Sequence, residues 1–464
     1  MKRYISVRLL AIITAFIMIL SLLAGCGARK EYAPEADYTA MSASDGDSGT
    51  PPAAAPAPPP APEPAPDYTA FGASSSGDPD EESYYEPAEG YSESEKVYMD
   101  SIGTDAKFDS PDSTDSVIPP SQQEIDRLRA GLLTAGEWND NENHSFILNL
   151  MQTNTDFRTF ENMWRYNLQN QVKVIVTDNG APVNNATAEL VDENGKTIYS
   201  ARTNNNGVAY LYNNLKAAGQ NSVAYVKASK AGSDTKEFDP YTSVYELSLP
   251  DQATAKSLDL MFVMDTTGSM SDELEYLKAE LEDIIRQVDR NNAGMNIRLS
   301  INVYRDVGDE YVVRPTPFTD NISEQISFLR RQSADGGGDW EESVEKALAD
   351  ALEQHDWNDS ATAKLMFLVL DAPPHNTDKI RDEMHRLTAV ASGMGVRIIP
   401  VASSGIDKVT EFLLRALSMA TGGTYVFLTD HSGIGGTHIE PTIGEYKVEQ
   451  LNELLIRLID GYLL

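Results

Sequence analysis

Short apolar runs alternate with amphipathic stretches from residue 256 to the C-terminus. Near-continuous apolar runs, such as LMFLVL at 365–370, are typical of parallel strands that are buried on both faces. Between the runs, apolar residues recur at three- and four-residue spacing, as at Leu274, Leu277 and Leu281, which predicts helices with one buried stripe. Strand–helix alternation predicts an α/β fold with a doubly wound, mainly parallel sheet over 256–464. The predicted strands are 258–264, 297–304, 311–314, 365–370, 396–401 and 424–428. Helices are predicted from near Ser271 to Val288 and near 323–331, 341–354, 379–391, 409–420 and 448–462.

A different pattern occupies residues 169–250. Short runs rich in β-branched and aromatic residues are separated by Asn-Gly pairs, which favour tight hairpin turns. Strands are predicted at 171–176, 187–191, 197–201 and 208–212. The pattern predicts a small β-sandwich, and it resembles the carboxypeptidase regulatory-like and Cna-B-like modules of bacterial surface proteins.

Helical spacing returns at residues 121–168, in two apolar groups. The first includes Leu128, Leu132 and Leu133, and the second begins at Phe146. The polar run at 139–143 lacks the glycine and the closing glutamate of a calcium loop, so it is interpreted as a turn. We therefore predict a helical segment over 121–168.

The first 120 residues are not expected to join a packed core. Residues 1–25 combine a basic start with an apolar run and small residues, which is typical of an export signal, although an uncleaved transmembrane helix is the alternative. Cys26 follows directly, and the segment resembles the lipobox of bacterial lipoproteins. That resemblance implies cleavage before Cys26, a lipid anchor on its sulfur, and a place on the extracytoplasmic face of the cell membrane. Residues 26–120 are rich in Pro, Ala, Asp and Glu and are predicted to form a disordered tether.

The charge balance excludes one class of partner. The formal net charge of the chain is −34, and such a surface repels nucleic acid at long range. We therefore expect no nucleic-acid binding.

The residues that carry chemistry follow the first predicted strand of 256–464. Asp265, Thr267 and Ser269 stand at two-residue intervals, so one carboxylate and two hydroxyls can turn toward a common point. Oxygen ligands of this kind are what Mg²⁺ requires. Asp371 ends the strand predicted at 365–370, and ligands of parallel sheets bind outside the carboxyl ends of the strands.

These residues resemble the metal-ion-dependent adhesion site of von Willebrand factor type A domains, whose first motif is Asp-Xaa-Ser-Xaa-Ser. The resemblance covers about 200 residues and implies one divalent cation, Mg²⁺ or alternatively Ca²⁺ or Mn²⁺. In this chain Thr267 replaces the first serine. The family has a further threonine ligand in the loop that corresponds to residues 335–342. This loop reads DGGGDWEE and contains no threonine, so Asp339 is the expected substitute. The metal ligands are therefore predicted to be Asp265, Thr267, Ser269, Asp339 and Asp371.

A third carboxylate would tighten the ion and weaken its attraction for an incoming anion, so we expect a partly structural metal or a weak or neutral partner ligand. The alternative to a metal site is that these residues are solvated acids of the loops and caps of the helices. Asp306, after another strand, is either a neighbour of the site or paired with Arg305. A zinc site involving His431, His438 and His375, which follows Asp371, is weighed against an ordinary glycine-rich loop, which is favoured.

The resemblance implies a lipid-anchored surface protein whose type A domain mediates adhesion or another protein–protein contact. One alternative is a regulatory or assembly factor for a surface enzyme complex. The other is a metal-dependent hydrolase, for which Glu342 is the candidate general base. No nucleophile elbow or phosphate loop occurs, so the chain is predicted not to be an enzyme.

Overall fold

The computed structural model describes residues 131–216, 221–252 and 255–464. The predicted signal peptide, Cys26 and the tether lie outside these residues. Among the described helices, none combines the length and the apolar composition needed to cross a bilayer.

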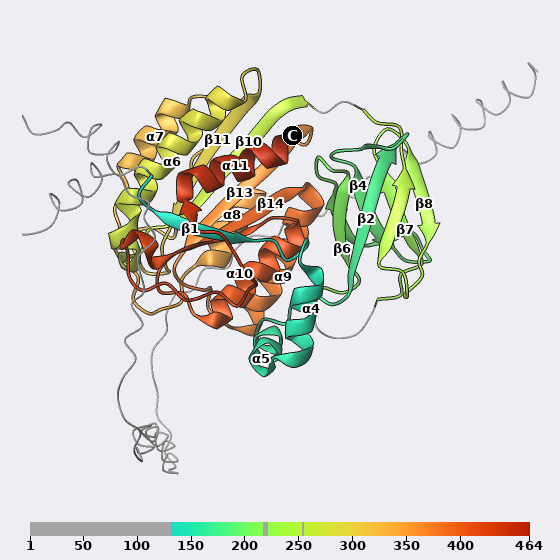
Figure 1. The fold of residues 1–464 in the computed structure, drawn as a ribbon, viewed down its shortest axis with the longest axis horizontal. Helices are drawn as coiled ribbons and strands as arrows, with labels where there is room; N and C mark the ends of the chain where they lie inside the picture. The colour runs from blue at the N-terminus through green and yellow to red at the C-terminus, as the bar shows by residue number, and fades with distance from the viewer. Residues whose placement is uncertain (1–130, 217–220, 253–254) are drawn as a thin grey trace, which may run out of the picture. The chain divides into compact units, whose positions relative to one another are not determined.

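The largest sheet contains the parallel strands that the sequence predicted. Within the described residues it has eight strands: β1 (Thr134–Trp138), β10 (Ala255–Asp265), β11 (Asn296–Tyr304), β12 (Val313–Arg314), β13 (Ala361–Leu370), β14 (Val396–Ala402), β15 (Tyr425–Leu428) and β16 (Glu449–Gln450). Their order is β12-β11-β10-β13-β14-β15-β1-β16, and Figure 1 labels its central strands β11, β10, β13 and β14. β10, β11, β13, β14 and β15 are parallel, and β12, β1 and β16 are antiparallel to their neighbours. The predicted α/β fold is confirmed.

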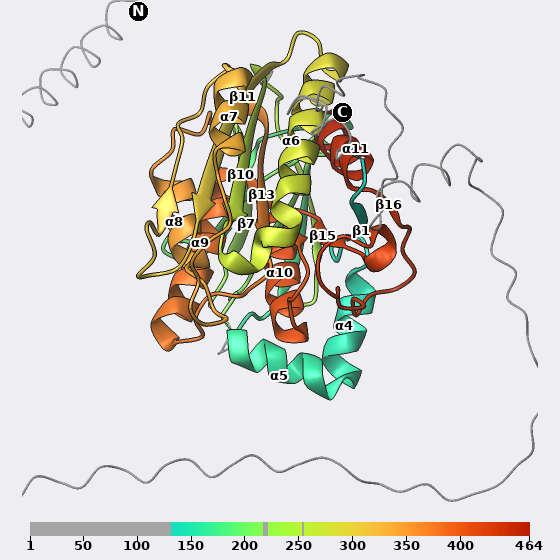
Figure 2. The ribbon, with the colours of Figure 1, turned by 90° about the vertical axis from the view of Figure 1, so that its left-hand side faces the viewer.

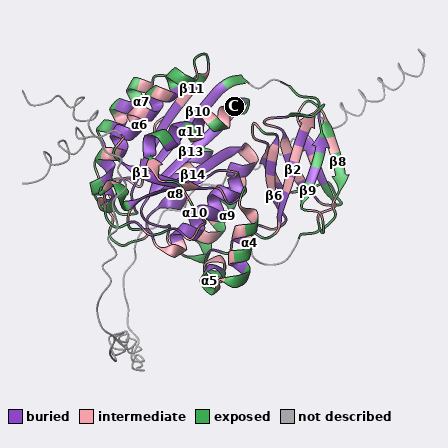
Figure 3. Cartoon of the chain, viewed as in Figure 1, coloured by how far each residue is buried: buried purple, intermediate pink, exposed green. Residues whose placement is uncertain are grey.

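Helices cover both faces of this sheet. They are α6 (Ser271–Asn291), α7 (Ile322–Arg330), α8 (Val344–Glu353), α9 (Asp378–Met394), α10 (Lys408–Thr421) and α11 (Leu451–Leu463). Along β13, Leu365 and Phe367 belong to one core with α6 and α11, while Met366 and Leu368 belong to the other with α8, α9 and α10. This alternation explains why the strand sequences are apolar at every position. Figure 3 shows the resulting burial along the strands.

The order of the strands reverses at β10, the first strand of the parallel set. The chain passes from β10 to β11 on one side and then returns to β13 on the other side of β10. Such a reversal opens a crevice at the carboxyl ends of the two central strands. Asp265 is the last residue of β10, and Asp371 follows the last residue of β13.

The secondary structure of residues 131–168 differs in part from the predicted helical segment. Helices α4 (His144–Thr153) and α5 (Thr155–Trp164) are present, and α5 lies against α10 (Figure 2). Residues 134–138, predicted as helical, instead form β1, which pairs with β15. The predicted turn at 139–143 is confirmed, and its Asp140 forms a buried 2.7 Å ion pair with Arg415 of α10. Residues before 256 thus complete the large sheet.

The β module, residues 171–248, contains two four-stranded sheets within the described part of the chain. Its strands are β2 (Gln171–Asp178), β3 (Ala181–Pro182), β4 (Thr187–Val191), β5 (Thr197–Arg202), β6 (Val208–Tyr212), β7 (Tyr225–Ser229), β8 (Ser233–Glu237) and β9 (Val244–Ser248). Val174 of β2 and Leu190 of β4 represent the inward positions, and both are fully buried. Asn179 and Gly180 have φ values of 49° and 87°, as the predicted hairpin turn requires. The four predicted strands are confirmed; β3, β7, β8 and β9 were not predicted.

Candidate functional site

The loop after β10 brings one carboxylate and two hydroxyls together. Asp265 is completely buried, and its Oδ1 accepts hydrogen bonds from the Thr267 backbone N–H at 2.8 Å and from Thr267 Oγ1 at 2.7 Å. Thr267 Oγ1 lies 3.3 Å from Ser269 Oγ. The two-residue spacing therefore converges as expected. A single 3-10 turn, Gly268–Met270, leads from this loop into α6.

Asp371 faces the same site from the end of β13. Burial raises the pKa of Asp371, while the nearby Ser269 hydroxyl lowers it. Burial also raises the pKa of Asp265, and the charge of Asp371 raises it further. The two carboxylates thus repel each other in a site from which water is largely excluded. Asp265, Thr267, Ser269 and Asp371 are brought together.

The loop at 335–343 closes over the first loop. Gly336 and Gly337 both have positive φ, at 80° and 75°, a backbone conformation that glycine adopts without strain. The Gly268 N–H donates to the Gly336 carbonyl at 3.2 Å. A Cβ on Gly337 would lie 3.1 Å from Glu342 Oε1 and 3.5 Å from Thr267 Cβ, so these two side chains flank the same glycine.

Glu342 is the acid of this loop that joins Asp265 and Asp371. It is 2% exposed, and its N–H donates to the Pro373 carbonyl at 2.9 Å, which ties it to the loop after Asp371. Burial raises the pKa of Glu342 to about 9, and the charges of Asp265, Asp306 and Asp371 contribute in that order. From the sequence, Glu342 was predicted only as a candidate base for a hydrolase. No spacing signal distinguished it from the other acids of the loop.

Three oxygens of this acidic group have no hydrogen-bond partner among the described residues: Asp265 Oδ2, Asp371 Oδ1 and Glu342 Oε2. The Tyr304 hydroxyl lies near Asp265 and lowers its pKa. This hydroxyl has no hydrogen-bond partner within 3.5 Å among the described residues. Buried polar atoms normally have a partner. Carboxylate and hydroxyl oxygens left unpartnered in a buried site fit a hard divalent cation.

Asp339 belongs to a second group, with Asp306 and His375. One potential ligand atom from each residue lies within 4.8 Å of the other two, and this is the only such group of three found in the described residues. Asp306 Oδ1 accepts a hydrogen bond from Ser343 Oγ at 2.8 Å and lies 3.4 Å from His375 Nε2. Asp306 also stands near Glu342, whose pKa its charge raises. Asp306 is therefore a neighbour of the site. Its side chain contacts Ser343 and His375 rather than Arg305.

His438 lies beside the site without forming a metal-like group of three in the described chain. Its Nε2 lies 3.1 Å from Glu273 Oε1, and its Nδ1 lies 2.8 Å from Asp430 Oδ1. Glu273, in the first turn of α6, also accepts the Ser404 N–H at 3.1 Å. Glu273 thus connects the loops of Ser404 and His438, and its charge raises the pKa of Asp371.

Comparison with known proteins agrees with this geometry. Residues 259–434 match the von Willebrand factor A domain family. This part of the chain, with its doubly wound sheet and its acidic loops at the carboxyl ends of β10 and β13, is a von Willebrand factor A domain. Domains of this family commonly bind a divalent metal and mediate protein–protein interaction.

Two further proteins are similar to parts of the chain. An ariadne-like RING finger protein of Acanthamoeba polyphaga mimivirus is 33% identical over 187 residues, which are 37% of this chain and 18% of that protein. The chain therefore spans less than a fifth of the length of this viral relative. The crystal structure of a conserved hypothetical protein, BatB, from Bacteroides thetaiotaomicron aligns with 13% identity and a TM-score of 0.32, covering 44% of this chain and 98% of that one.

Proposed function

We propose that the von Willebrand factor A domain holds one divalent cation, Mg²⁺ or in its place Ca²⁺ or Mn²⁺, and uses this site to bind a protein partner at the cell surface. The observation that carries the proposal is the group of three buried carboxylates, Asp265, Asp371 and Glu342, each with an unpartnered oxygen within the described chain. Ionised carboxylates buried together are unfavourable unless a cation compensates them.

In this proposal Asp265, Thr267, Ser269 and Asp371 are ligands, as the family motif implies. The third carboxylate, which was predicted to be Asp339, comes from Glu342 in this proposal. Glu342 is buried beside Thr267, whereas Asp339 is exposed beside Asp306 and His375. A bound cation would neutralise the carboxylates and leave a coordination position for an oxygen of the partner.

The surroundings favour a partner that binds through apolar contact as well as through the ion. Three carboxylates neutralise a divalent cation more completely than two, so its attraction for an acidic side chain of the partner is weaker. Val307 is 63% exposed next to Asp306, and Trp340 is 45% exposed next to Asp339. Large apolar side chains on the loops of a binding site are typical of interaction surfaces. We propose a partner that offers a neutral oxygen ligand and an apolar patch.

The proposal includes attachment to the membrane on its extracytoplasmic face through a lipid on Cys26. It rests on the apolar run and the small residues before Cys26, and on the resemblance of residues 169–250 to surface modules. Labelling of the chain by an alkyne fatty acid, lost in Cys26→Ser, is the expected result. Equal labelling of Cys26→Ser would contradict it.

We propose no catalytic role. The candidate base of the hydrolase alternative, Glu342, is here a cation ligand, and it stands between Asp265, Asp371 and Asp306. A regulatory or assembly role for a surface enzyme complex remains compatible with a binding module and differs from adhesion only in the identity of the partner. The proposal includes no nucleic-acid partner, because a net charge of −34 repels the phosphate backbone.

The test is calorimetric titration of Mg²⁺ into the full chain, stripped with chelator and held in detergent. We expect one ion per chain, a loss of affinity of roughly 10-fold or more in Glu342→Gln, and an unchanged affinity in Asp339→Asn. The matched control is Asp289→Asn on the exposed face of α6. Loss of binding in Asp339→Asn with none in Glu342→Gln would reverse the assignment, and a wild-type chain that binds no ion would refute the metal proposal.

The partner is tested by crosslinking the chain on intact cells. Partners captured in Mg²⁺ should be lost with chelator and in Asp265→Asn. A partner that Asp265→Asn retains at wild-type level would show that the ion does not mediate the contact.

A further inference from the structure

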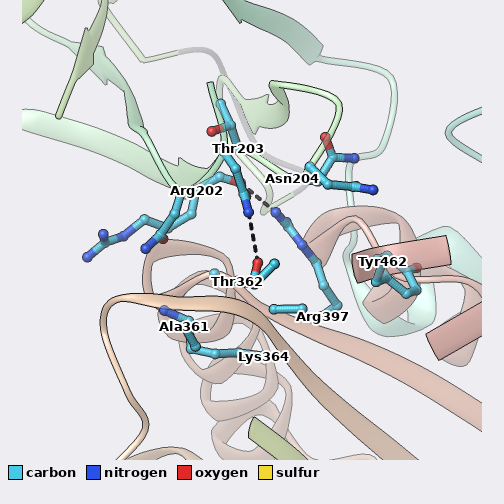
Figure 4. A pocket seen from close by; sticks show the side chains of 13 residues that line it. Arg202, Thr203, Asn204, Ala361, Thr362, Lys364, Arg397 and Tyr462 are labelled. Carbon is cyan, nitrogen blue, oxygen red and sulfur yellow. Dashed lines mark hydrogen bonds between the residues drawn. The ribbon is translucent and has the colours of Figure 1, made fainter. Parts of the chain in front are cut away.

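A pocket lies where the β module meets the first residues of β13 and β14 (Figure 4). Three cationic side chains line it: Arg202 from the end of β5, Lys364 from β13 and Arg397 from β14. β13 and β14 are neighbours, with Leu365 paired to Arg397. Basic groups thus gather at one place in a chain whose net charge is −34.

Lys364 is the most unusual of the three. It is 3% exposed, and its Nζ is buried with no hydrogen-bond partner among the described residues. None of the ion pairs within the described ranges includes it. A buried ammonium without a partner is strongly unfavourable, and buried lysines are almost always paired.

The two arginines donate to carbonyl groups, which satisfies N–H donors but leaves the charges unneutralised. Arg397, 6% exposed, donates to the carbonyls of Thr421 at 2.8 Å and Arg202 at 2.7 Å. Figure 4 shows this side chain extending from β14 toward the β module. Arg202 Nε donates to the Gly393 carbonyl at 3.3 Å.

The charges of two carboxylates, Asp359 and Asp259, raise the pKa of Lys364, but neither carboxylate forms an ion pair with its ammonium group. Asp359 is exposed to solvent. Asp259 is already bound by Arg298, whose Nη2 lies 2.7 Å from its Oδ2. The pocket therefore retains an excess of positive charge.

The size of the pocket restricts what it can hold. The cavity volume is about 20 Å³, and roughly 10–15 Å³ accommodates one water molecule. This size favours a single-atom ion over a tetrahedral oxyanion such as sulfate or phosphate.

From these observations we infer that the pocket binds one small monovalent anion of chloride size, held by the Lys364 ammonium in a pocket that the Arg202 and Arg397 side chains also line. The anion stabilises the junction between the β module and the von Willebrand factor A domain. Asn184 Nδ2, on the rim of the same pocket, already bridges this junction by donating to the Thr362 carbonyl at 2.9 Å. The inference is independent of the metal site.

The test measures the thermal unfolding temperature of the full chain at constant ionic strength and constant Mg²⁺, with chloride replacing gluconate. The wild type should gain roughly 2–4 °C for each tenfold increase in chloride above the dissociation constant. Lys364→Met keeps the length of the apolar stem and removes the charge, so its unfolding temperature should not respond to chloride. The control Lys236→Met, exposed on β8, should respond as the wild type does.

A second readout does not depend on unfolding. The folded wild type should broaden the ³⁵Cl resonance, and bromide should compete for the effect. Arg202→Met, half-buried and less central to the core, provides a second variant in which broadening should fall. Equal chloride responses in wild type and Lys364→Met, absence of broadening in the wild type, or stronger stabilisation by sulfate than by chloride would each overturn the inference.

Discussion

The two ends of β13 carry buried charges of opposite sign. Asp371 directly follows the last residue of the strand, beside Asp265 and Glu342, whereas Lys364 is the fourth residue of the strand, beside Arg397. Each end holds buried charged groups with an atom that has no hydrogen-bond partner in the described chain: one oxygen each of Asp265, Asp371 and Glu342 at the first end, and Lys364 Nζ at the second. The same strand therefore presents an acidic group where ligands of parallel sheets are expected and a basic group at the opposite edge.

The difference lies in which parts of the chain build each end. Loops of the von Willebrand factor A domain alone build the acidic end, from residues 265–269, 335–343 and 371–375. The basic end also requires Arg202 and Asn184 of the β module. The proposed cation at the first end would order loops of one domain, and the proposed anion at the second would hold two domains together. Two ions of opposite charge would thus have separable effects on stability.

The largest effect is expected from Asp265→Asn. With Mg²⁺ at 100–1,000 times the dissociation constant, the wild type should gain about 3–4 kcal/mol of unfolding free energy, and the variant should lose this gain. In chelator the order should reverse, because asparagine keeps the acceptor for Thr267 and removes one repelling charge. Urea unfolding with and without Mg²⁺ measures both.

Asp289→Asn, exposed on α6, is the control for that experiment and should follow the wild type in both buffers. If Asp265→Asn were less stable than the wild type in chelator, repulsion among the carboxylates would not be the dominant force at this end of the strand.

The second prediction concerns pH at the acidic end. Burial raises the folded-state pKa values of Asp265, Asp371 and Glu342 above their ordinary values, to about 7, about 6 and about 9. The folded state then binds more protons than the unfolded state, so stability in chelator should fall as pH rises from about 5 to 8.5. We expect a loss of roughly 2 kcal/mol attributable to this group.

Mg²⁺ should remove that slope, because the cation favours the ionised carboxylates. Glu280, whose pKa burial raises to about 7, contributes a background of the same sign, and Asp265→Asn retains that background. The measurement is therefore the difference between wild type and Asp265→Asn. A wild-type chain whose stability in chelator does not change with pH would contradict the prediction.

The sequence predicted the acidic end in large part. Asp265, Thr267 and Ser269 were recognisable because an apolar strand and a helix flank them, and Asp371 because it ends a strand. The choice between Asp339 and Glu342 depended on the path of the loop at Gly336 and Gly337, whose positive φ values turn the chain. Spacing along a sequence does not determine where such a turn directs the next acid.

The basic end was not predicted, for a physical reason. Lys364 stands at the start of an apolar run, where a lysine is ordinarily solvated, and the module that covers it lies more than 100 residues earlier in the chain. Strand β1 was missed for a similar reason. It has five residues, and its partner β15 is separated from it by nearly the whole described chain. Local patterns do not report contacts of this range.

The smallest expected effect is the pH dependence of stability at the basic end, and its sign is opposite to that at the acidic end. Burial lowers the pKa of Lys364 to about 8, with Arg202 as the next cause, so in gluconate the unfolded state binds more protons between about pH 8 and 10.5. Stability should therefore rise by about 1 kcal/mol from pH 8 to 9 in the wild type relative to Lys364→Met. Saturating chloride should abolish the rise, because a bound anion favours the ammonium. Denaturant titrations in gluconate and chloride at the two pH values provide the comparison, with Lys236→Met as control. A slope of the same sign as that at the acidic end would show that the charges at the two ends of β13 do not act as the structure indicates.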